Sequence, residues 1–168
     1  MNLLINITDI GKYREVSKGL STDKIKPFIR EAQEIDLRGH ICRKFFDDLM
    51  LNWQDANYQE LLTGATYEYE DYTYSFEGLK AVLSYYAFSR LIMFGNAVST
   101  PFDMVQKTNE WSDPISTAQR RDMHKECRQI AAKYWEDCKH YLKAKEDDFP
   151  VWNECNCYTP NRLKVEKI

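Results

Sequence analysis

Histidine and cysteine are the residues of this sequence that could hold a metal ion or supply a nucleophile. His124 and Cys127 lie three residues apart in a segment of helical periodicity, and Cys155 and Cys157 could add two thiolates, which would suit a metal-dependent enzyme. The spacing argues against zinc, because the ligands of a pair are usually separated by about two to four residues, whereas only Asn156 stands between Cys155 and Cys157. We therefore expect no metal site, and reduced thiols at the five cysteines.

Other catalytic patterns are also missing from the sequence. The three histidines, His40, His124 and His140, do not lie in motifs that specify an activated base. The six glycines form no phosphate-binding loop, and no acidic calcium loop is present. We therefore expect a protein that is not an enzyme and needs no cofactor.

Composition points to one globular domain with binding surfaces. A chain of 168 residues with 43% hydrophobic content is long enough for a single core. Its 23 basic and 26 acidic residues are interspersed, which gives no concentrated field for nucleic acid or anionic lipid. No signal peptide or membrane span is predicted, so we expect a soluble protein that starts in the cytosol. Eleven tyrosines favour protein interfaces.

The N-terminal third predicts helices that would form part of the core. Residues 8–11 predict one helical turn with Thr8 as its cap. A longer helix follows the capping residues 21–23, and its apolar stripe ends at Ile35. Pro27 should lie in the first turn of this helix, or the regular helix should begin there. After Gly39 the stripe continues to about residue 51, as a kinked helix or as two joined helices.

Three further helices are predicted downstream. A short helix at residues 58–63 should close at Gly64, and residues 77–97 are apolar nearly all round, as in a central buried helix. An irregular stretch should follow from residue 99 to residue 113. The last helix should start at Asp113, or at Ser116 in a capping box with Gln119. Its apolar seam begins at Met123 and includes Cys127 and Cys138 as small core residues.

A tyrosine-rich segment changes the apolar period from helical to two. If Glu70–Asp71 forms a two-residue turn, Tyr69 lies opposite Tyr72 and Tyr67 opposite Tyr74, so the four rings share one face of a β-hairpin. The turn lacks the usual glycine, so a longer loop is an alternative. The tyrosine face either packs on the helices or reaches a neighbouring chain. We take these four tyrosines as candidate interface residues.

After Phe149-Pro150 the sequence loses its periodicity, which predicts an irregular or extended tail. The tail holds more apolar residues than solubility requires, namely Trp152, Tyr158, Leu163 and Val165, and these complete the candidate protein interface. The sequence thus predicts a mainly α protein, a small bundle of about four main helices with one short β-hairpin. We divide it into a helical domain at residues 1–153 and an extended C-terminal tail at residues 154–168.

The order of these elements resembles the head-tail connector (adaptor) proteins of tailed phages, above all those of crAss-like and other Bacteroidetes phages and related prophages. The resemblance covers about residues 1–153 and is carried by Phe45-Phe46-Asp47-Asp48-Leu49, Phe76-Glu77-Gly78-Leu79-Lys80, Tyr85-Tyr86-Ala87, Lys107, Ser112-Asp113-Pro114 and Phe149-Pro150-Val151-Trp152. The sequence departs from that pattern at Asp103, where a glycine is expected.

The resemblance implies a structural virion protein that forms a ring, dodecameric in such adaptors, beneath the portal protein. The ring would continue the DNA channel toward the next tail protein without sequence-specific DNA binding and without a membrane. It would lie in the neck of the virion, after assembly in the bacterial cytoplasm. The alternative is a small helical accessory protein, monomeric or dimeric, that binds a regulatory partner. Oligomeric state separates the two.

Overall fold

The fold is built around a helix that is apolar on every side. A computed structural model describes residues 2–17, 19–95, 97–99, 104–106 and 115–155, and this part of the chain is mainly helical, as predicted. Helix α5 (Gly78–Phe94) lies at its centre, with Leu79, Val82 and Leu83 fully buried. Its central place confirms the prediction for residues 77–97.

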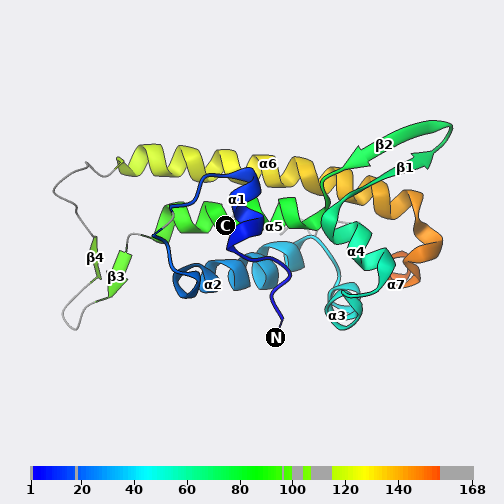
Figure 1. Cartoon of the computed structure of the whole chain (residues 1–168), viewed down its shortest axis with the longest axis horizontal. Coiled ribbons are helices and arrows are strands. Elements are labelled where there is room, and N and C mark those ends of the chain that lie inside the picture. Colours follow the sequence, from blue (N-terminus) through cyan, green and yellow to red (C-terminus); the bar gives the residue numbers. More distant parts are fainter. Residues whose placement is uncertain (1, 18, 96, 100–103, 107–114, 156–168) are drawn as a thin grey trace, which may run out of the picture.

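Helix α6 (Thr117–Ala144) lies antiparallel beside α5 and makes the most extensive contact of the fold (Figure 1). It begins at the predicted capping box of Ser116 and Gln119. With 28 residues against 17, α6 is longer than α5 by about 16 Å at ~1.5 Å per residue. Met123, expected in the core, is 41% exposed and lies near the N-terminal end of α6. Cys127 and Cys138, farther along the same seam, are buried as predicted.

The other sides of α5 are covered by α1 (Ile7–Tyr13), α2 (Thr22–Glu31) and α4 (Ala56–Thr63). Helix α2 continues into a π-helical turn, η1 (Ala32–Asp36), and a 3₁₀ turn, η2 (Leu37–Gly39). Helix α3 (Arg43–Asn52) follows as a separate helix, so of the two predicted alternatives the structure has two joined helices and not one kinked helix. The chain after α6 forms a 3₁₀ turn, η3 (Glu146–Asp148), and a short helix, α7 (Pro150–Glu154), which packs against α3.

Three local predictions for the N-terminal part are wrong. Asn6 rather than Thr8 caps α1, because the Asn6 and Asp9 side chains form a reciprocal capping box. Pro27 lies inside α2, since burial of Ile25 and Ile29 outweighs the backbone hydrogen bond that proline removes. Ile35 is 58% exposed, because the π-helical turn changes the angular position of the residues that follow α2.

Two hairpins lie at opposite ends of the helical body (Figure 1). Strands β1 (Ala65–Tyr69) and β2 (Tyr72–Phe76) form the predicted hairpin between α4 and α5. Gly64 and Gly78 flank it with positive φ angles of 86° and 78°. A side chain on Gly78 would collide with the backbone of Leu62 and Gly64, so both glycines are needed to close the base of this hairpin.

The second hairpin falls in a stretch that was predicted to be irregular. Strand β3 (Ala97–Ser99) pairs with β4 (Met104–Gln106) in antiparallel register. Each strand has three residues, which is too short for a recognisable period-two pattern. The prediction of an irregular segment from residue 99 to residue 113 is therefore wrong for β4.

Candidate interaction surface

The tyrosine hairpin has the register that the sequence predicts. Tyr69 pairs with Tyr72 and Tyr67 pairs with Tyr74, and the turn consists of two residues, Glu70 and Asp71. Both turn residues have positive φ angles, 49° and 65°, as a type I′ turn requires. The two-residue turn therefore forms without a glycine, because Glu70 and Asp71 both adopt the left-handed conformation.

Most of the tyrosine face packs on α6 of the same chain, around His140. The Tyr67 hydroxyl lies 2.5 Å from Nδ1 of His140. The ring centroids of Tyr74 and Tyr69 lie 4.6 Å and 5.4 Å from that of His140. Tyr67 also meets Tyr141 edge to face, and its burial raises the pKa of its hydroxyl to about 12. Tyr67 is therefore a core residue, and Tyr69 is half-buried against α6.

The tip of the β1–β2 hairpin is more exposed to solvent than its base. Tyr72 is 69% exposed and Tyr74 is 37% exposed. Glu70 and Asp71, next to Tyr72, are exposed as well. Figure 1 shows the hairpin extending past the helices. The part of this hairpin that a partner could reach is thus its acidic, aromatic tip.

Trp152 belongs to the folded body, which corrects its placement in an irregular tail. Phe149 is fully buried, and Pro150 occupies the first turn of α7, where its fixed φ favours a helix. The Trp152 ring meets Phe45 at 5.1 Å and Trp135 at 6.1 Å. The helical domain accordingly continues to the end of α7. Periodicity could not reveal a helix of five residues.

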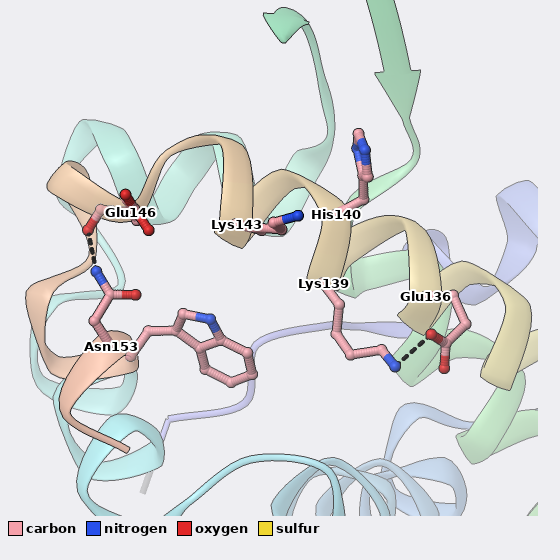
Figure 2. A pocket seen from close by; sticks show the side chains of 7 residues that line it. Glu136, Lys139, His140, Lys143, Glu146 and Asn153 are labelled. Carbon is pink, nitrogen blue, oxygen red and sulfur yellow. Dashed lines mark hydrogen bonds and ion pairs between the residues drawn. The ribbon is translucent and has the colours of Figure 1, made fainter. Parts of the chain in front are cut away.

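A hollow of 390 Å³ lies between α6 and α7, beside His140. It is lined by Glu136, Lys139, His140, Lys143, Glu146, Trp152 and Asn153, and we call it the α6–α7 groove. Figure 2 shows Glu136, Lys139, His140 and Lys143 along α6, and Glu146 and Asn153 in the chain that follows it. Asn153 donates a 2.8 Å hydrogen bond to the Glu146 carbonyl at one end, and Lys139 pairs with Glu136 at the other.

The groove and the hairpin thus adjoin the same turn of α6. His140 contacts Tyr67, Tyr69 and Tyr74 and also lines the groove with Trp152. Three of the candidate interface residues, Tyr67, Tyr69 and Tyr74, are therefore gathered around one histidine, whereas Tyr72 stands apart at the tip. The remaining candidates, Tyr158, Leu163 and Val165, lie outside the described residues.

The cysteines differ from the expectation of reduced thiols. Cys42, at the start of α3, and Cys155, at the end of α7, form a disulfide across 113 residues of sequence. The pairing follows from the packing of α7 on α3, which is also held by an ion pair of Lys44 with Glu154. Nothing in the local spacing of the cysteines could predict it.

The metal reading gains no support from the structure. Cys155 is in the disulfide, and Cys127 and Cys138 are buried, which raises the pKa of both thiols. Cys157 lies outside the described residues. Among the described residues, no group of three or more histidine, cysteine or acidic side chains is placed to hold a metal ion.

Sequence reasoning missed a cluster of charges beneath α5 and α6. The carboxylate of Asp36, almost fully buried, accepts a 2.7 Å hydrogen bond from Nε of Arg90 and a 2.8 Å bond from Nη1 of Arg128. Arg90 also pairs with Glu31 at 2.8 Å. Each Asp36 oxygen has a guanidinium partner, so the cluster joins η1 to α5 and α6. In the sequence, the only indication that Asp36 is buried is its position next to the apolar stripe that ends at Ile35.

The helices bear on membrane insertion, and similarity to known proteins bears on the protein family. No helix in the described parts of the chain has the length and apolarity to cross a lipid bilayer. Residues 36–162 match a protein family described as "Family of unknown function (DUF6712)". Neither a curated protein nor a solved structure matches the chain.

Proposed function

The chain belongs to the DUF6712 family, and we propose that it is a structural subunit of a tailed-phage head-tail connector. In this proposal the subunit has no catalytic role. Copies of it form a ring beneath the portal protein, and the ring carries the DNA channel toward the next tail protein. Its place is the neck of the virion, after assembly in the host cytoplasm.

The observation that carries the proposal is the exposed aromatic tip of the β1–β2 hairpin. Tyr72 is 69% exposed on an element that extends past the helices, and it makes no contribution to the core. Large aromatic side chains in such places are typical of protein interfaces. The resemblance of the sequence to connector proteins supplies the identity of the assembly. The mainly helical fold is consistent with this proposal, because a helical body can hold surfaces that bind other subunits.

Tyr72 and Tyr67 form a matched pair of test positions. We expect Tyr72→Ser to weaken self-association by about 1 to 2 kcal/mol, as aromatic truncation at interfaces often does, with the unfolding midpoint nearly unchanged. Tyr67→Ser should instead lower the stability of the monomer, because Tyr67 is buried on α6. Sedimentation velocity and urea unfolding measure the two effects. The opposite ranking would mean that the tip is not the subunit contact.

The oligomeric state tests the ring itself. Electron microscopy of the purified protein, alone and with the portal protein and the next tail protein, should show rings. A chain that stays monomeric or dimeric at micromolar concentration in both settings would refute the connector proposal. It would favour the accessory protein that binds a regulatory partner.

A further inference from the structure

We propose that the tip of the β1–β2 hairpin of one copy docks on a basic face of helix α6 of a neighbouring copy. This inference rests on the proposed ring, and it names the surface that receives the tip. The tip consists of Glu70, Asp71 and Tyr72, and the basic face consists of Arg121 and Lys125. Both surfaces belong to the described part of the chain.

The tip combines negative charge with an exposed aromatic ring. Glu70 and Asp71 form the turn and, like Tyr72, are exposed. Glu68 on β1 adds a third exposed carboxylate, and the hairpin from Ala65 to Phe76 contains no basic residue. Its side chains therefore sum to −3. A surface that binds this tip needs cations next to an apolar contact.

Helix α6 separates its charges by side. Arg121, Lys125 and Arg128 follow one another at steps of four and three residues, which places them on one side of the helix. Arg128 shows where this side lies, because it pairs with Asp36 of η1 at 2.8 Å. Glu126 instead pairs with the C-cap residue of α1. Charges that are interspersed in the sequence thus form a basic face on the folded helix.

The cations of the basic face are not neutralised by described residues. Arg121 and Lys125 are exposed, and neither forms an ion pair within the described parts of the chain. The neighbouring cluster around Asp36 is balanced, since two carboxylates match two guanidinium groups. Residues 115–128 hold four basic and two acidic side chains, a net charge of +2 when His124 is neutral. The charge of this surface is therefore complementary to that of the tip.

An exposed aromatic ring lies at the same end of the molecule as the basic face. Phe94 ends α5 and is 54% exposed. It follows Arg90 by four residues, so the two share the side of α5 that meets the Asp36 cluster. Because α5 and α6 are antiparallel, Phe94 lies one turn beyond Arg90 in the direction of Arg121 (Figure 1). Tyr72 of the tip can thus pack on an aromatic ring and on a guanidinium group.

The folded chain keeps the tip away from its own basic face. The hairpin packs on His140, and Arg121 lies 19 residues earlier in α6, about 28 Å away at ~1.5 Å per residue. From there the hairpin extends past the opposite end of the helical body (Figure 1). The two surfaces can therefore meet only between copies. A contact between two different surfaces is head-to-tail, and such contacts form rings when their rotation closes.

A photocrosslink in the full-length protein locates the contact of the tip. Tyr72 is replaced by the photoreactive amino acid benzoylphenylalanine, and ¹⁵N-labelled and unlabelled copies are mixed before irradiation. We expect crosslinks to peptides that contain Arg121 or Phe94, with both isotopes in one crosslinked pair. Crosslinks to other surfaces overturn the inference. Pairs that always contain a single isotope also overturn it, because they show docking within one chain.

Charge reversal tests the complementarity. Glu70→Lys with Asp71→Lys reverses the tip, and Arg121→Glu with Lys125→Glu reverses the face. Each double variant should self-associate roughly tenfold more weakly at low salt. An equal mixture of the two variants should associate again, because each tip then meets an oppositely charged face on the other variant. A mixture that associates no better than its components overturns the inference.

A matched control reverses two exposed cations elsewhere, Lys24→Glu on α2 with Lys133→Glu on α6. It should have little effect on association, and a loss as large as that of the face variant overturns the inference. Binding of a DNA duplex is measured in parallel. If Arg121→Glu with Lys125→Glu abolished DNA binding and left association unchanged, the basic face would bind nucleic acid and not the tip.

The two proposals fail in different ways. Rings whose Tyr72 crosslinks map outside the basic face would leave the connector proposal standing and remove the docking site. A protein that sediments as a monomer would remove the connector proposal, and the contact between copies with it.

Discussion

Asp36 shows how a single residue can hold three elements together. It lies in η1 and its two oxygens bind guanidinium groups from α5 and α6. Removing the carboxylate in Asp36→Ala would leave Arg90, whose side chain is 15% exposed, without its main partner. Breaking a buried pair in this way usually costs about 3 to 5 kcal/mol, and we expect a loss near the lower limit because Arg128 is more exposed.

Urea unfolding of Asp36→Ala measures this loss. The control is Asp23→Ala, which removes an exposed ion pair with Lys26 and should change the unfolding midpoint little. Equal stability of the two variants would show that the buried cluster does not stabilise the fold.

Tyr67 predicts a specific response to alkaline pH. Burial raises its pKa to about 12, above the value of ~10 for an exposed tyrosine. The folded state therefore holds the Tyr67 proton more tightly than the unfolded state. The protonated Tyr67 hydroxyl therefore contributes fully to the free energy of unfolding below pH ~10, and this contribution is lost as the pH rises from about 10 toward 12.

The variant Tyr67→Phe isolates this effect from the other tyrosines. Phenylalanine cannot ionise, so the stability of the variant should fall less steeply than that of the wild type between about pH 10 and 12. Below pH 9 the variant should be less stable by about 0.5 to 1.5 kcal/mol, because it lacks the hydrogen bond to His140. Parallel slopes for the two proteins would contradict the assignment of Tyr67 to a buried site.

At the scale of elements, α7 is attached to α3 by three kinds of contact. These are the Cys42–Cys155 disulfide, the Lys44–Glu154 ion pair and the packing of Phe45 on Trp152. A disulfide that closes a loop of this length typically stabilises a fold by about 2 to 4 kcal/mol. We expect the double variant Cys42→Ser with Cys155→Ser to lose stability of that size relative to the oxidised protein.

The redox state of the wild type provides the control for this prediction. Reduced wild type should unfold at nearly the same denaturant concentration as the double variant, and alkylation before unfolding should leave Cys42 and Cys155 unmodified only in the oxidised protein. A double variant as stable as the oxidised wild type would show that noncovalent contacts alone hold α7.

The elements show which features the sequence could predict. Helices α5 and α6 and the register of the β1–β2 hairpin follow from local periodicity and capping, and all are confirmed. The disulfide and the Asp36 cluster join residues 113, 54 and 92 positions apart, and no local pattern encodes such pairings. The π-helical turn after α2 and the short α7 were missed for a related reason, since tertiary contacts determine both.

The candidate surface was predictable to a similar degree. The alternation of tyrosines placed four rings on one face, but only packing on His140 shows which of them are buried. Trp152 could be recognised as an anchor, yet its partners Phe45 and Trp135 come from distant parts of the chain. A sequence pattern gives the face of an element, whereas the partner of that face depends on the assembled fold.

At the scale of the whole molecule, the boundary between the folded body and the C-terminal segment can be located by two truncations. Deleting residues 156–168 should leave the helical circular dichroism spectrum and the melting temperature nearly unchanged, because every described contact of α7 is retained. Deleting residues 154–168 also removes Glu154 and Cys155, and with them the ion pair and the disulfide to α3.

The longer deletion should therefore lower the melting temperature by roughly 5 to 15 °C, the shift expected for a loss of about 2 to 4 kcal/mol in a chain of this size. Both truncations should lose self-association, since both lack the tail residues of the candidate interface, Tyr158, Leu163 and Val165. If both truncated proteins melted at the temperature of the full-length chain, the boundary would lie before Glu154. A shorter truncation that melts as early as the longer one would assign residues 156–168 to the fold, whereas undiminished association in both would show that the segment is dispensable for assembly.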